Sequence, residues 1–288
     1  MEQREEWSAA RAAEAGPHVI SSAPVPRATE PTPPILRVRD LSKRYSGLVA
    51  LTDYDLDLAP HSLHGVIGPN GAGKTTLFNL LSGMVRPTTG SIHLEDVDIT
   101  PLPAHQVARL GIARTFQSIR LFNDMTAIDN VRVAIQQRQP ASLAATLLST
   151  SGFHRLEREA TAQAVAILER MGLADRADRR SGGLPYGDQR RLEIARAVAS
   201  APRILLLDEP NAGMNPTETA ALLDLIRRLR DDMGLTIILV AHDIPLVMNL
   251  CERIQVLNYG LVIADGPPAT VRNDPGVIKA YIGQARDA

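Results

Sequence analysis

The sequence has little cysteine, few aromatic residues and no excess of positive charge. Its single cysteine, Cys251, can form no disulfide within the chain and leaves no ligand cluster for zinc, a pattern typical of a reducing compartment. Only 3% of the 288 residues are aromatic, and 31 basic residues stand against 32 acidic ones. Surfaces for nucleic acid need basic patches or stacking aromatics, so this composition argues against a nucleic-acid partner.

Long hydrophobic runs are also missing. The longest apolar run covers residues 235–241, far short of the roughly 20 residues that a transmembrane helix requires. Any role at a membrane is therefore expected to depend on a partner. Residues 1–34 contain six prolines and almost no large apolar side chains, which predicts a disordered tail. The hydrophobic fraction of the whole chain, 44%, is enough for a buried core in the remainder.

The order of apolar segments predicts an α/β fold. Residues 35–38 and 54–58 alternate apolar and polar side chains, as half-buried strands do, and we expect them to pair antiparallel at an edge. Short apolar segments at 65–67, 204–207 and 236–240 are instead typical of buried parallel strands. A sheet of this kind needs helices on its faces.

A largely helical region interrupts this pattern. Between about 101 and 183 the β-branched runs become rare and helix-forming residues dominate, most clearly in 155–171. We therefore expect one domain over 35–284, whose core comprises 35–100 and 184–284, with a helical subdomain inserted between these two parts.

The segment Gly68–Thr75 reads GPNGAGKT and fits the phosphate-loop pattern G-x-x-x-x-G-K-[ST]. It follows an apolar strand and opens a helical run, which is the context that the motif requires. The glycines let backbone N–H groups face phosphates, Lys74 is expected to bridge the β- and γ-phosphates, and Thr75 to ligate Mg²⁺. Alone, the motif indicates nucleotide phosphates and does not separate kinases, GTPases and motor proteins.

Two carboxylates follow the buried strand at 204–207. Asp208 is expected to hold the Mg²⁺ shell, as the acid at the end of such a strand does in phosphoryl-transfer sites. Glu209 is the next residue and points in another direction, so it is placed to accept a proton from the attacking water. Without the phosphate loop, this pair would be interpreted as two surface acids at a strand end. The phosphate loop upstream favours the catalytic interpretation.

Two further polar side chains follow strands. His242 comes after 236–240, at the end of a strand where ligands of open α/β sheets gather, and is expected to hydrogen-bond the γ-phosphate. Gln117 ends the predicted strand 111–116 and is a neutral amide able to contact both Mg²⁺ and water.

Taken together, these motifs resemble the nucleotide-binding subunits of ATP-binding cassette (ABC) transporters over about residues 35–284. The resemblance includes the segment 184–191, which matches the family's signature, and Asn215. The features Thr115–Phe116–Gln117, Tyr186, Gly213–Pro216 and 277–283 look most like the ATP-binding proteins of branched-chain amino acid importers. Urea and short-amide importers have similar subunits.

The resemblance implies a P-loop NTPase sheet core with an antiparallel β edge and an inserted helical subdomain, an ABC ATPase-like α/β fold. It implies ATP and Mg²⁺ as ligands and a place on the cytoplasmic face of the cell membrane, as a peripheral protein. The implied partners are a second ATP-binding subunit, either a copy or a paralogue, integral membrane permease subunits and, indirectly, an extracytoplasmic substrate-binding protein. The transported substrate is not encoded in this chain.

The resemblance also assigns residues. Tyr45 would stack on adenine, although a core-filling role is an alternative. Residues 118–125 would receive a helix of the membrane subunit, and the turn 211–216 would face the partner subunit. Thr126 is expected to cap the following helix. The phosphates would be held by Gly68, Pro69, Asn70, Gly71, Ala72, Gly73, Lys74, Thr75 and Thr76, and the signature that contacts the partner's ATP would be Leu184, Pro185, Tyr186, Gly187 and Asp188.

The signature departs from the family pattern at two positions. Pro185 stands where the family usually has serine, and can offer neither a hydroxyl nor an amide to phosphate. Asp188 stands where glutamine is usual, and is expected to cap its helix while bringing negative charge toward phosphate. A weakened signature half-site follows, which mildly favours a paralogue as partner. Pro185→Ser is then expected to raise the hydrolysis rate of the assembled complex.

Two other functions remain open at this point. One is a soluble ABC-type ATPase acting in DNA repair or on ribosomes, although the long coiled coils or fused cassettes of such proteins are absent. The other is a weakly hydrolysing regulatory cassette, suggested by Pro185 and Asp188 and opposed by the intact Asp208, Glu209 and His242.

Overall fold

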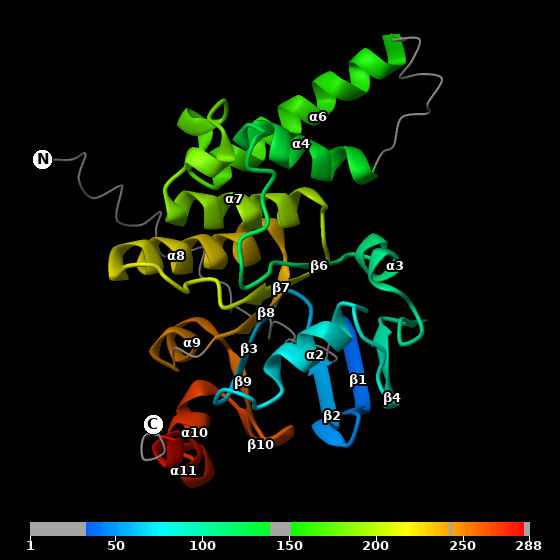
Figure 1. Ribbon diagram of the computed structural model, residues 1–288, viewed down its shortest axis with the longest axis vertical. Helices are drawn as coiled ribbons and strands as arrows, with labels where there is room; N and C mark the ends of the chain where they lie inside the picture. Colours follow the sequence, from blue (N-terminus) through cyan, green and yellow to red (C-terminus); the bar gives the residue numbers. More distant parts are fainter. Residues whose placement is uncertain (1–32, 139–150, 242–243, 285–288) are drawn as a thin grey trace, which may run out of the picture. The chain divides into compact units, whose positions relative to one another are not determined.

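The computed structural model describes residues 33–138, 151–241 and 244–284 (Figure 1). The expected tail therefore lies almost entirely outside the described residues, and so does His242. Within the described residues the strands form two sheets, one of four strands and one of six. None of the described helices is long and apolar enough to cross a membrane.

The four-stranded sheet is antiparallel in the order β2-β1-β4-β5. Leu36 lies opposite Leu58 and Val38 opposite Leu56, which confirms the predicted pairing of 35–38 with 54–58. These four side chains are buried, while their neighbours along each strand are more exposed, as expected for a sheet with one covered face. The strands are β1 (Leu36–Tyr45), β2 (Leu48–Leu58), β4 (Thr89–Leu94) and β5 (Val97–Asp98).

The six-stranded sheet has the order β10-β9-β3-β8-β7-β6, parallel except for the antiparallel edge strand β10. It contains the three predicted parallel strands, and every residue of β3, β7 and β8 is buried. The bounds are β3 (Leu63–Ile67), β6 (Ile112–Arg114), β7 (Ile204–Asp208), β8 (Thr236–Val240), β9 (Arg253–Asn258) and β10 (Leu261–Gly266).

A hydrophobic core lies on each face of the six-stranded sheet. Successive side chains of a strand point to opposite faces, so Ile204 and Leu206 of β7 belong to one core and Leu205 and Leu207 to the other. The first core contains α2 (Lys74–Leu81), which lies between the two sheets (Figure 1). The second is covered by helices, among them α7 (Tyr186–Ala199), α8 (Pro216–Met233) and α9 (Ile244–Leu250).

The inserted region is mostly helical. Helix α4 (Ala127–Arg138) contacts α6 (Ser151–Arg170) and α7. Thr126 caps α4 as predicted, because its hydroxyl oxygen accepts the amide of Asp129 at 3.2 Å. The short 3-10 turns η1 (Ala174–Arg176) and η2 (Ser181–Gly183) lead into α7.

The start of the inserted region includes sheet structure. Strand β6 pairs with β7 in the main sheet, after the short helix α3 (Ala104–Arg109). The range 101–114 therefore contains an edge strand of the core rather than helices alone. The C-terminal helices are α10 (Pro268–Arg272) and α11 (Pro275–Gln284).

Candidate nucleotide-binding and hydrolytic site

The phosphate loop connects β3 to α2, and two of its glycines are fixed by close backbone neighbours. A Cβ at Gly68 would lie 2.2 Å from the carbonyl oxygen of Leu257, and one at Gly73 would lie 2.6 Å from that of Ala50. Gly73 also has φ +107° at the N-cap of α2. Side chains at either position would therefore push the loop away from β2 and β9, which hold it in place.

Lys74 begins α2 and folds back into the loop. Its Nζ donates to the carbonyl oxygens of Gly68 at 2.5 Å and Pro69 at 2.9 Å. Burial lowers the pKa of Lys74, an effect that the nearby charges of Glu209 and Asp208 oppose. A triphosphate would offer this ammonium group charged acceptors in place of neutral carbonyls. Thr75 is exposed and Thr76 half-buried in the first turn of α2.

Asp208 ends β7 and forms a buried ion pair with Arg114 of β6. Arg114 Nη2 lies 2.8 Å from Asp208 Oδ2, and both side chains are 7% exposed. Arg114 also donates to Oδ1 of Asn79 in α2 at 2.7 Å, so one guanidinium joins two strands of the sheet to the phosphate-loop helix. No motif in the sequence points to Arg114.

Glu209 and Gln117 are brought together, although they lie 92 residues apart. Gln117 Nε2 donates to Glu209 Oε2 at 3.1 Å. Glu209 has φ +45°, a left-handed conformation that is unfavourable for a residue other than glycine. Its amide donates to the carbonyl oxygen of Val240 at 2.8 Å, which ties this turn to the end of β8.

Two residues of α7 hold the backbone around Gln117. Arg190 is fully buried and donates to the carbonyl oxygens of Phe116 and Gln117, at 2.7 and 3.0 Å, and to that of Glu209 at 3.2 Å. Its partner Glu193 lies 2.7 Å away. Arg190 lies within the signature segment 184–191, but the sequence predicted neither its contacts nor Glu193; the signal available was an arginine and a glutamate three positions apart on one helix.

The signature segment packs against the turn before α8. Pro185 is exposed and is the N-cap of α7, without a side-chain hydrogen bond to the helix. Tyr186 is 43% exposed, and a Cβ at Gly213 would lie 3.3 Å from its ring. Gly187 faces Glu218, whose Oε1 would lie 3.0 Å from an added Cβ. Leu184 is buried.

The structure corrects the expectation for Asp188. Its carboxylate is 4% exposed and forms ion pairs with Arg176 and Arg191. It therefore neither caps α7 nor presents charge outward; it ties α7 to the turn η1. The reason is that Pro185 occupies the N-cap position, so that Asp188 lies in the first turn of α7, where the two arginines pair with its carboxylate.

Tyr45 lies at the end of β1 and is 39% exposed, with Lys43 Nζ 5.0 Å from its ring centroid. This exposure contradicts the core-filling alternative and leaves a ring face able to stack.

Among the described residues, no group of three or more His, Cys, Asp or Glu side chains could hold a metal ion. The available oxygen donors, Thr75, Gln117 and Asp208, instead suit Mg²⁺ that takes most of its ligands from phosphates and water.

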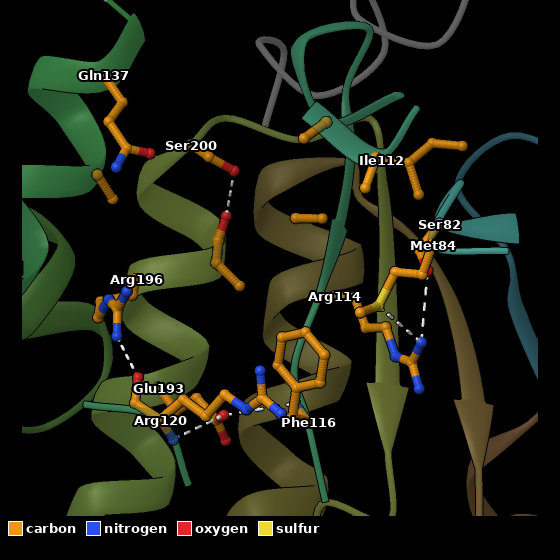
Figure 2. Close-up of a pocket in the computed structure, with 15 residues that line it drawn as sticks. Ser82, Met84, Ile112, Arg114, Phe116, Arg120, Gln137, Glu193, Arg196 and Ser200 are labelled. Atoms are coloured by element: carbon orange, nitrogen blue, oxygen red, sulfur yellow. Dashed lines mark hydrogen bonds between the residues drawn. The ribbon is translucent and has the colours of Figure 1, made fainter. Parts of the chain in front are cut away.

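A pocket of about 390 Å³ lies between β6 and α7, and no residue of the phosphate loop lines it (Figure 2). Arg114, Phe116 and Arg120 line one side, and Glu193 and Arg196 of α7 line the other. Of the range 118–125, which was expected to form a groove for a membrane subunit, Arg120 lines this pocket. The pocket therefore borders the residues that hold Gln117 and Asp208.

A phosphate loop after a buried parallel strand, with an acidic pair at the end of another parallel strand of the same sheet, defines a P-loop NTPase. Comparison with known proteins refines this class. The family model described as ABC transporter matches residues 51–212, and one described as branched-chain amino acid ATP-binding cassette transporter matches 262–287. The chain belongs to the ABC transporter family as an ATP-binding cassette, an ATPase that drives transport.

Relatives of known function cover most of the chain. It is 48% identical over 252 residues to the high-affinity branched-chain amino acid transport ATP-binding protein LivG of Escherichia coli strain K12, covering 88% of this chain and 99% of that protein. Identity to BraF of Pseudomonas aeruginosa, which carries the same description, is 47% with the same coverage.

Solved structures share the fold. The ADP conformation of MJ1267, an ATP-binding cassette of an ABC transporter, superposes with a TM-score of 0.74 at 28% identity, covering 86% of this chain and 98% of that one. For cbiO1 from Clostridium perfringens, part of the cbiONQ transporter complex, the TM-score is 0.73 at 26% identity, with coverage of 89% and 100%.

Proposed function

We propose that this chain hydrolyses ATP to power an importer of branched-chain amino acids. The observation that carries the hydrolytic part is the hydrogen bond between Gln117 and Glu209, directly beside Asp208. The substrate class is supported by the names of LivG and BraF and by the C-terminal match over 262–287.

ATP would bind across the phosphate loop. Tyr45 stacks on adenine, the loop amides and Lys74 hold the phosphates, and Thr75, Asp208 and Gln117 hold Mg²⁺. When bound, Mg²⁺ supplies positive charge that offsets the charge developing on the transferred phosphoryl group. The carboxylates of Glu209 and Asp208 favour the charged form of Lys74, against the burial that lowers its pKa.

Hydrolysis would use Glu209 as the general base. The carboxylate takes a proton from water, the water oxygen forms a bond to the γ-phosphorus, and the bond from that phosphorus to the β–γ bridging oxygen breaks, so ADP and phosphate leave. Gln117 holds the carboxylate at 3.1 Å and orients it. His242 donates a hydrogen bond to the γ-phosphate in this proposal.

The chain would work as one of two ATP-binding subunits, each contributing Leu184–Asp188 to the ATP of the other. ATP joins the two faces and ADP does not, so binding and hydrolysis close and open the pair. The pocket beside Arg114 would receive a permease helix, which places the chain peripherally on the cytoplasmic face of the membrane. An extracytoplasmic binding protein would deliver the substrate.

The test combines hydrolysis with transport. Purified chain, with and without its permease subunits, should release phosphate from ATP, and Glu209→Gln should reduce the rate about 100-fold or more without weakening ATP binding. Glu169→Gln, an exposed glutamate on α6, is the matched control. Full turnover by Glu209→Gln would remove Glu209 from its role. In vesicles with binding protein, uptake of leucine rather than urea is expected.

A further inference from the structure

The contacts of Arg190 are concentrated on the backbone of the hydrolytic site. Its two terminal nitrogens donate to three carbonyl oxygens, those of Phe116, Gln117 and Glu209, all within 3.2 Å. These carbonyls belong to two segments far apart in sequence, each carrying a side chain that faces the reacting water in the proposed function. One planar group therefore sets the distance between both segments.

Glu193, also on α7, contacts both Arg190 and the segment that contains Gln117. Its Oε2 pairs with Arg190 at 2.7 Å, and its Oε1 accepts the amides of Phe116 and Arg120 at 3.4 Å. Figure 2 shows Glu193 directed toward Arg120 and Phe116. The pair thus binds both the carbonyl and the amide groups of the segment that contains Gln117.

The other contacts of this segment lie on either side of Gln117, whose side chain is exposed. Strand β6 ends at Arg114, after which Thr115 donates its amide to Leu206 and its hydroxyl oxygen accepts from the amide of Asp208. On the other side, Arg196 donates to the carbonyl oxygen of Arg120. Glu209 occupies a left-handed conformation, which persists only where surrounding contacts enforce it. The hydrogen bond from Arg190 to the carbonyl oxygen of Glu209 is a contact of that kind.

We propose that Arg190, paired with Glu193, is a positioning residue for hydrolysis. It holds Gln117 and Glu209 at the separation that lets the amide orient the carboxylate. Arg190 lies on α7, whose N-terminus follows Pro185, so the helix that faces the partner's ATP also sets the general base of its own subunit. The role in hydrolysis rests on the proposed function; the anchoring of the two segments does not.

If the ion pair only stabilised the fold, a different effect on hydrolysis would be expected when both residues are replaced. Removing one member of a buried pair destabilises a protein, whereas replacing both with apolar residues of similar volume is often neutral or stabilising. If the pair served stability alone, Arg190→Met/Glu193→Leu would keep both the stability and the hydrolysis rate of the wild type. If the pair positions Gln117 and Glu209, the double variant keeps the stability of the wild type but hydrolyses ATP more slowly.

The experiment compares four full-length proteins, the wild type, Arg190→Lys, Arg190→Met/Glu193→Leu and a control. The control is Arg132→Met/Glu157→Leu, which removes an arginine–glutamate pair with a 3.3 Å contact that joins α4 to α6 and touches neither segment. For Arg190→Lys and the apolar pair we expect kcat to fall about tenfold or more at unchanged KM for ATP. Lysine retains the charge but lacks the fork that reaches three carbonyls.

Amide hydrogen exchange tests the anchoring without ATP turnover. In both Arg190 variants, exchange over residues 115–121 and 209–212 should quicken about tenfold or more, while α8 keeps the wild-type rate. Unchanged exchange in these segments, or a wild-type rate of hydrolysis in the apolar double variant, overturns the proposal. If the wild type hydrolyses no ATP, the proposed function fails, and the exchange result still decides whether Arg190 anchors the two segments.

Discussion

At the scale of single residues, the ion pair of Arg114 and Asp208 is the most consequential feature that motifs do not reveal. Asp208 is the residue expected to serve Mg²⁺, yet one of its oxygens is already bound by Arg114 at 2.8 Å. The guanidinium also lies 5.5 Å from the ring centroid of Phe78 and 5.2 Å from that of Phe116. Arg114 therefore orients the carboxylate and fills a space between two aromatic rings.

Arg114→Met should destabilise the protein, because it leaves the buried Asp208 carboxylate without its cation. The expected loss is about 3 kcal/mol in the free energy of unfolding, measured by urea denaturation. Arg39→Met is the control: Arg39 also pairs with an aspartate, Asp57, at 2.7 Å, but the side chains are 41% and 55% exposed. Such a surface pair contributes about 1 kcal/mol or less. Equal losses of unfolding free energy in the two variants would contradict the claim that burial makes the Arg114–Asp208 pair the more important one.

The residues recognised from sequence and those missed differ in one physical respect. Adjacent residues are enough to recognise the phosphate loop and the pair Asp208 and Glu209, because a glycine-rich turn or a strand end is a local structure. Arg114 and Arg190 act on partners 94 and 73 residues away. The role of Arg114 depends on the pairing of β6 with β7 and on the packing of α2, and the role of Arg190 on the packing of α7 against the sheet. No local pattern encodes either arrangement.

At the scale of elements, the end of β6 illustrates how side chains compete with strand pairing. The predicted strand covered 111–116, but β6 ends at Arg114. The backbone of Phe116 donates to Glu193 and accepts from Arg190, so it is unavailable to a neighbouring strand. The apolar pattern was read correctly, but it carries no information about side chains that bind the backbone of another element.

Strand β3 carries a buried histidine that makes stability depend on pH. His64 is 2% exposed, and burial lowers its pKa to about 4, although Asp265 and Gln255 favour the charged form; Arg253 opposes it. The unfolded chain has an ordinary histidine pKa of about 6.5 and so binds this proton first as pH falls. The stabilisation is therefore complete above pH 6.5 and is lost as pH falls toward 4.

Between pH 7.5 and 5 this histidine should reduce the free energy of unfolding by about 2 kcal/mol. Urea denaturation at the two pH values measures the loss, and His64→Leu should show a correspondingly smaller one because its side chain cannot take up a proton. His105, which lines a surface pocket, provides the matched substitution His105→Leu, for which the loss should equal that of the wild type. Equal losses in the wild type and His64→Leu would contradict the assignment.

At the scale of the whole molecule, the pocket and the hydrolytic site are connected through shared residues. Arg114 lines the pocket and binds Asp208, while Glu193 lines it and binds Arg190. A helix seated in the pocket, as proposed for a permease subunit, would therefore contact Arg114, which pairs with Asp208, and Glu193, which reaches Glu209 through Arg190. In the proposed complex, these contacts would connect the membrane subunit to the ATP site.

Association of two copies around ATP is the last expectation that the molecule as a whole must meet. Glu209→Gln with saturating ATP and Mg²⁺ should give a particle of twice the 31.2 kDa monomer mass in solution scattering, because bound ATP that is not hydrolysed stabilises the associated state by mass action. Adding Lys74→Ala to this variant removes a main phosphate contact and should restore the monomer. Monomers of Glu209→Gln at saturating ATP, even with the permease subunits present, would contradict association through ATP, and pairing only with a different cassette would identify a paralogue as the partner.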